Sequence, residues 1–171
     1  MAQAVFCIAD SEARAERIVR ELRDAGFGEE SISILFPDEN GSHELAHEAH
    51  SKAPEGASTG LGTGALVGGT IGWLSGVGAI AVPGLGALIA AGPILATLTA
   101  ATAGAAVGGL TGALVGYAVP EFEAKLYEGK LATGNFLLSV HTTSVVQQAH
   151  VREIFETNGA TDISQREEAR V

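Results

Sequence analysis

The two ends of the chain carry the short apolar runs and longer amphipathic stretches that are typical of strands and helices. Residues 3–9 are apolar and predict a strand. Over residues 12–25 the apolar positions recur at helical spacing, which predicts a helix that ends at Gly26. Residues 31–36 predict a second strand, which Pro37 stops.

The C-terminal part of the chain repeats this order. Residues 135–141 predict a strand, a helix follows that ends at Gly159, and residues 162–165 predict a last strand. Two strand–helix–strand units of similar sequence favour an α+β fold, a pseudo-symmetric βαββαβ sandwich of ferredoxin-like type. One such unit has too small a core to be stable alone, so we expect residues 1–40 and 121–171 to be two halves of one domain.

A long apolar segment, residues 56–120, separates the two halves and contains no Asp, Glu, Lys, Arg or His. The ten Lys and Arg residues and the twenty Asp and Glu residues of the chain all lie outside it. Helices over residues 57–81 and 94–119 would each be long enough to cross a bilayer core of about 30 Å. Residues 83–93 would connect them, so the pattern predicts a long helical hairpin that interrupts the sandwich.

Glycines recur at intervals of four residues in both predicted helices. This spacing places them on one helix face, where the missing side chains allow two backbones to approach closely. The positions expected to pack are Gly60, Gly64, Gly68, Gly72 and Gly76 in the first helix and Gly104, Gly108, Gly112 and Gly116 in the second. The hairpin is therefore predicted to be a glycine zipper that associates with other copies of the chain, which makes the protein a homo-oligomer.

Two environments suit such a hairpin. A bilayer favours helix because it removes the water that competes for backbone hydrogen bonds. The first expectation is therefore a membrane-associated protein, with its hairpin in the lipid bilayer and a soluble head in the cytoplasm. The alternative is a cytoplasmic assembly, a particle or filament in which the hairpins of several subunits bury one another. A channel is a third interpretation, which the absence of charged side chains in the segment disfavours.

Charge and composition exclude one class of partner. The net charge is −10 and only 5% of the residues are aromatic, so basic patches and stacking surfaces for nucleic acid are not expected. The single cysteine, Cys7, lies in the first predicted strand. An intrachain disulfide is therefore impossible, and a buried thiol in a reducing compartment is the expected state.

The polar connector over residues 41–55 holds the main candidates for metal binding. His43, His47 and His50 would share one face of a helix, where three imidazoles can converge on a transition metal. The letters HELAH also resemble the HExxH motif of zinc proteases, with Glu44 in the position of the general base. A connector of this length cannot build a catalytic cleft, so we expect a solvated helix that binds at most an adventitious or regulatory metal.

No other residues stand out as catalytic. The sequence contains no phosphate-binding loop, no nucleophile elbow and no obvious acid or nucleophile–base pair, so we expect a non-enzymatic protein without a cofactor. No small-molecule substrate is identified. Residues 121–131 predict a short amphipathic helix with Phe122, Leu126 and Leu131 on one side, which would cover the sandwich or lie along a membrane.

Three stretches of the chain resemble a known family. They are the opening VFCIADSEARAERIVRELRDAGF, the long glycine-rich apolar insert, and the closing YEGKLATGNFLLSVHT followed by ETNGATDIS. Together they resemble the bacterial general stress and low-temperature-induced small proteins. The resemblance implies a stress-associated bacterial protein with a ferredoxin-like fold interrupted by a glycine-zipper hairpin. It implies no catalytic residues, and the histidine cluster is not part of the family pattern.

Overall fold

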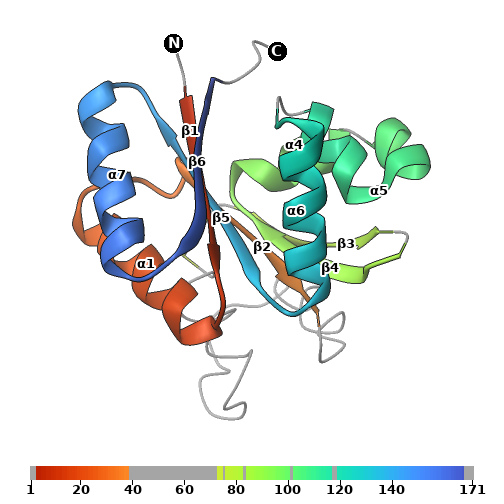
Figure 1. Ribbon diagram of the computed structural model, residues 1–171, viewed down its shortest axis with the longest axis horizontal. Helices are drawn as coiled ribbons and strands as arrows, with labels where there is room; N and C mark the ends of the chain where they lie inside the picture. The colour runs from red at the N-terminus through yellow and green to blue at the C-terminus, as the bar shows by residue number, and fades with distance from the viewer. Residues whose placement is uncertain are drawn as a thin grey trace.

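The computed structural model describes residues 3–38, 73–74, 76–82, 84–100, 102–116 and 119–167. In this part of the chain the fold is α+β, with a six-stranded antiparallel sheet and five helices (Figure 1). The elements are β1 Gln3–Ala9, α1 Glu12–Asp24, β2 Ile32–Pro37, β3 Val77–Val82, β4 Gly86–Ala91, α4 Pro93–Ala100, α5 Thr102–Gly116, α6 Glu121–Ala132, β5 Phe136–Thr142, α7 Val145–Thr157 and β6 Thr161–Glu167. The expected α+β class is confirmed.

Strands from both ends of the chain interleave in one sheet. Its order is β3-β4-β2-β5-β1-β6, and every neighbouring pair is antiparallel. Strand β1 lies between β5 and β6, so that Val5 is opposite Val140 on one side and Gln165 on the other. The strands and helices predicted in the two flanks all form. Each strand pairs with a neighbouring strand of this sheet, and each helix packs its apolar side chains on the sheet.

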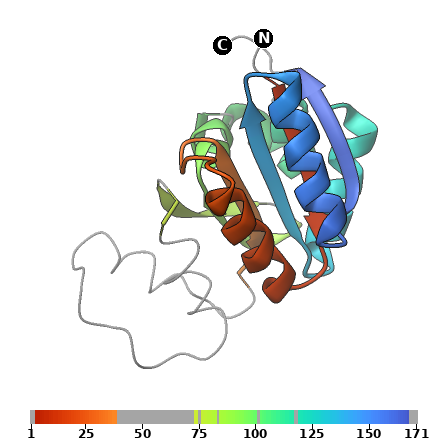
Figure 2. The ribbon, with the colours of Figure 1, turned by 90° about the vertical axis from the view of Figure 1, so that its left-hand side faces the viewer.

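Both faces of the sheet are covered. Successive strand residues point to opposite faces, so one apolar strand supplies two layers of core. Helices α1 and α7 cover the first face, and α4, α5 and α6 cover the second face (Figures 1 and 2). On β1, Val5 and Cys7 belong to the first core and Phe6 and Ile8 to the second. Cys7 is buried as expected, and its burial raises the pKa of the thiol well above the ordinary value.

The prediction of a first helix in the apolar segment is wrong for the residues of that helix that the structure describes from position 77 onward. Residues 77–82 form strand β3, and residues 86–91, expected in the connector, form strand β4. The hairpin adds two strands to the sheet through pairing of β4 with β2. The physical reason is that strands buried on both faces are continuously apolar, so they lack the alternation that distinguishes strands from helices. The rest of that predicted helix lies outside the described residues.

The predicted second helix is also different. Residues 94–119 were expected to be one helix, but they contain α4 and α5, which are 8 and 15 residues long. Helix α5 is itself interrupted at Gly109, which has φ 60° and ψ −151°. No helix in the described ranges is long and apolar enough to cross a membrane, so the prediction of a transmembrane hairpin is wrong. The apolar side chains of this region, such as Leu98 and Leu114, are instead buried on the second face of the sheet.

A buried hydroxyl and a glycine fix the turn from β4 into α4. Gly92 ends the strand, and Pro93 occupies the first helical position, where its missing N–H is not needed. The hydroxyl of Ser33 on β2 accepts a hydrogen bond from the N–H of Ile94, with 3.1 Å between the two atoms. A side chain from a neighbouring strand therefore caps this helix, which ties the apolar segment to the sheet.

The amphipathic helix predicted over residues 121–131 forms as α6 and covers the sheet, but its inward face is different. Phe122 and Leu126 are 70% and 40% exposed, whereas Tyr127 and Leu131 are buried. The helix is rotated because Glu123 points inward and pairs with Arg166 on β6, with 3.2 Å between Oε2 and Nε. A buried carboxylate needs such a partner, and this pair fixes α6 against the edge of the sheet.

Candidate functional site

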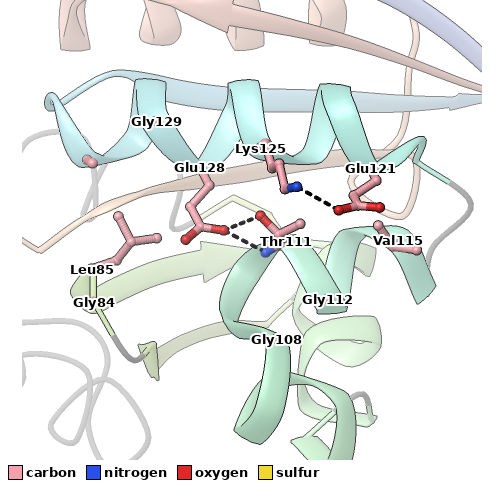
Figure 3. A pocket seen from close by; sticks show the side chains of 11 residues that line it. Gly84, Leu85, Gly108, Thr111, Gly112, Val115, Glu121, Lys125, Glu128 and Gly129 are labelled. Atoms are coloured by element: carbon pink, nitrogen blue, oxygen red, sulfur yellow. Dashed lines mark hydrogen bonds and ion pairs between the residues drawn. The ribbon is translucent and has the colours of Figure 1, made fainter.

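A hollow in the described structure lies between α5, α6 and the turn from β3 to β4 (Figure 3). Its volume is about 760 Å³. Its walls include four glycines, Gly84 on the turn, Gly108 and Gly112 on α5, and Gly129 on α6. We call it the α5–α6 groove.

The groove is open because its glycines contribute no side chains. A Cβ atom added at Gly84, Gly108 or Gly129 would meet no other atom within 4 Å. The same is true at Gly116, the last residue of α5. Gly108 and Gly116 of α5 therefore face open space in this subunit. Helix α5 contacts α6 across the groove, and it also contacts α4 and β3.

A carboxylate in the groove replaces a helix cap. The break at Gly109 interrupts the helical backbone two residues before Thr111, and N–H groups at the start of a helical stretch need partners from outside it. Glu128 of α6 accepts this N–H at 2.8 Å and also the hydroxyl of Thr111 (Figure 3). A negative charge at a helix start is favourable, so Glu128 holds the second part of α5 against α6.

The other charged side chains of the groove form an ion pair. Glu121 and Lys125 lie one turn apart on α6, with 2.6 Å between Oε1 and Nζ. The hydrogen bond and the charge of Lys125 lower the pKa of Glu121, and Glu121 raises the pKa of Lys125 in return. Both groups are solvent-exposed, so the pair adds little to stability. Each charged group that lines the groove thus has a partner within the chain.

Exposed apolar side chains lie on the two helices that form the groove. Val115 on α5 is 43% exposed, and Phe122 and Leu126 lie one turn apart on the solvent side of α6. Together with Gly108 and Gly116 we call them the α5–α6 face. In the described ranges the exposed large apolar residues are Val115, Phe122, Leu126, Val145 and Val146, so three of the five lie here.

The structure brings together only part of the predicted zipper. Gly108, Gly112 and Gly116 lie on α5, which also includes position 104. Gly76 lies outside any helix, directly before β3, so its predicted packing role in a helix is wrong. Gly60, Gly64, Gly68 and Gly72 lie outside the described residues. The helix that α5 contacts across the groove is α6, which carries charged residues rather than a second glycine series.

The predicted metal ligands are not tested. His43, His47 and His50 lie outside the described residues. In the part of the chain that is described, no group of three or more His, Cys, Asp or Glu side chains is placed to hold a metal ion.

Sequence reasoning missed Glu128, Thr111 and the exposure of Phe122. The adjacent glycines at 108 and 109 were the available signal for a break in the helix, and hence for an uncapped helix start. The resemblance to the general stress proteins stays a prediction. Comparisons with protein-family models, with curated proteins and with solved structures found no match for this chain.

Proposed function

We propose that this chain is a non-enzymatic structural protein that self-associates, and that its copies bind one another through the α5–α6 face. The observation that carries the proposal is the outward direction of Gly108 and Gly116 on α5, where an added Cβ meets nothing, together with the 70% exposed side chain of Phe122 on α6. A large exposed aromatic side chain on one helix and glycine positions without side chains on the neighbouring helix offer a ridge and a groove. Such surfaces fit a second copy of themselves.

The physical gain comes from apolar burial and close backbone contact. Full burial of one Phe side chain contributes about 1.5–3 kcal/mol to the free energy of association. In a two-fold contact the Phe122 side chain of each copy is buried, so this contribution is made twice. Glycine positions on a helix also allow Cα–H···O contacts between backbones. The groove offers no unpaired charge to a small ligand, since Lys125 and Glu128 are already engaged. These features support a structural role over a catalytic one.

The proposal includes the fold type and the biological setting. The strand order β2-β5-β1-β6, with α1 and α7 on one face, is the order expected of a ferredoxin-like sandwich, and β3 and β4 extend it at the β2 side. We infer that the apolar insert covers the second face of the sheet, which in such a sandwich would otherwise be exposed to solvent. The stress-associated role rests on the resemblance of the three stretches of sequence alone.

The test is the molar mass of the full chain in detergent-free buffer, measured by sedimentation velocity and light scattering. Phe122→Glu should lower the mass, because association would bury an unpaired carboxylate. Gly108→Leu should do the same by filling the groove, while its helix propensity is better than that of glycine by about 0.8–1 kcal/mol.

Val145→Glu is the matched control for this experiment. Val145 is 76% exposed, but it lies at the start of α7 on the first face of the sheet. Its substitution should leave the molar mass unchanged. If Phe122→Glu and Gly108→Leu also leave the mass unchanged, the α5–α6 face is not the contact surface.

A further inference from the structure

Helix α5 is bent at one residue. Gly109 has φ 60° and ψ −151°, a backbone conformation that essentially only glycine adopts. On both sides of it, between Thr102 and Gly116, the backbone is helical. Rotation about the backbone of Gly109 alone would therefore convert this helix into a continuous one. We call the two shapes the bent form and the straight form of α5, and Gly109 the hinge.

The part of α5 after the hinge is fixed to its own subunit. Leu110 and Leu114 are buried in the core on the second face of the sheet. The N–H of Val119 donates to the carbonyl of Leu114 at 3.1 Å, which holds the end of the helix. A rotation at the hinge would therefore leave this part in place and move residues 102–108.

A side chain from another helix holds the bent form. In a continuous α-helix the N–H of Thr111 donates to the carbonyl four residues earlier, and the ring that this bond closes includes Gly109. In the bent form the carboxylate of Glu128 on α6 accepts this N–H at 2.8 Å and also accepts the hydroxyl of Thr111 (Figure 3). Hydrogen bonds to a charged group are stronger than those between neutral groups. Glu128 therefore favours the bent form, whereas the straight form satisfies the same N–H without Glu128.

We propose that α5 is a hinged element which Glu128 holds in the bent form, and that the bent form is the one that binds a second copy, a step that rests on the proposed function of the α5–α6 face. Gly108, Thr111 and Glu128 all line the groove. Straightening would move Gly108 relative to α6 and so change the shape of the groove. Association and bending then stabilise each other, because a partner that binds one form better shifts the equilibrium towards that form.

The hinge is tested in the Phe122→Glu chain by the ¹³Cα chemical shift of Gly109, in protein labelled at its glycines. Adding Glu128→Ala should move this shift from a non-helical to a helical value, because the N–H of Thr111 then takes its partner from its own helix. Glu128→Gln keeps an acceptor oxygen at the same position and should retain the bent form. Glu156→Ala is the matched control, since it removes a paired carboxylate from α7 on the other face of the sheet, and it should leave the shift unchanged.

Association is measured by sedimentation velocity in the chain that retains Phe122. Glu128→Ala and Gly109→Ala should each raise the dissociation constant at least about tenfold. Alanine at position 109 adopts the helical conformation but not that of the bent form. Both changes act on one equilibrium, so Glu128→Ala should add nothing in the Gly109→Ala chain. If Gly109→Ala does not fold, Glu128→Ala alone decides between the two outcomes.

The two measurements separate the hinge from the contact between copies. A Gly109 shift that stays non-helical in the Glu128→Ala chain overturns the hinge, whatever the state of association. A helical shift with unchanged or tighter association overturns the claim that the bent form is the one that binds. If Phe122→Glu leaves the molar mass unchanged, the α5–α6 face fails as a contact surface, and the Gly109 shift still decides on the hinge.

Discussion

Gly92→Ala should remove about 4 kcal/mol or more of the free energy of unfolding, which is a large part of the stability of a small domain. Gly92 has φ +83°, a conformation that L side chains rarely adopt. An added Cβ would also collide with the carbonyl oxygen of Ile32 and lie 3.0 Å from the Cα of Ser33. Both obstacles are backbone atoms of β2, so no side chain can move aside to accommodate the methyl group. Urea denaturation of the purified variant measures the loss.

Gly84→Ala is the control that separates collision from strain. Gly84 has φ +87°, but a Cβ there would meet nothing within 4 Å. Its substitution should cost only the left-handed strain, about 1–2 kcal/mol. Equal losses for the two variants would mean that β4 does not lie against β2 as described.

Leu114→Ala is expected to lower the free energy of unfolding by about 2–5 kcal/mol, the usual range for a fully buried leucine. Leu114 of α5 has no exposed surface and belongs to the core between the second face of the sheet and its helices. Thermal and urea denaturation of the variant give the loss. Because this packing lies within one subunit, the loss should not depend on protein concentration.

The neighbouring residue supplies the comparison for Leu114. Val115→Ala removes part of an exposed side chain, so its effect on the unfolding of the monomer should be within about 0.5 kcal/mol. A loss for Leu114→Ala that disappears at high protein concentration would place this leucine in a contact between subunits. A loss as small as that of Val115→Ala would show that α5 is not packed on the sheet.

The sequence allowed the flanks to be predicted because their signals are local. Short apolar runs predict β1 and β5, and an amphipathic pattern predicts α1. Each of these patterns lies within the segment whose structure it predicts. The start of α7 is another local signal, because Ser144 directly before the helix accepts a hydrogen bond from the N–H of Gln147 at 3.2 Å. The extension of the sheet by β4 had no such local signal.

The apolar segment was misinterpreted because its burial comes from the rest of the fold. Residues of β4 such as Leu88 and Ile89 are buried on opposite faces, which makes the strand apolar throughout. A segment without charge has the same composition whether lipid or a sheet covers it. The regular spacing of the glycines also suggested one structure for all of them, but Gly76 precedes a strand and Gly108 lies on a helix.

The α5–α6 face was predicted in part. The sequence placed Gly108, Gly112 and Gly116 on one helix and assigned them to packing between helices. It did not place Phe122 outside, because the rotation of α6 follows from the ion pair between Glu123 and Arg166. A partner 43 residues further along the chain cannot be inferred from the spacing of apolar positions alone.

The central claim is that the charge-free segment after residue 76 forms a layer of its own subunit, and hydrogen exchange tests it most directly. Mass spectrometry of the full chain, at low concentration in detergent-free buffer, would follow peptides from residues 86–98 and 136–142. The account predicts that both regions are protected to a similar extent, because β4 and β5 both flank β2 in one sheet. Rapid exchange of residues 86–98, with protection that appears only at high protein concentration or with lipid vesicles, would contradict it.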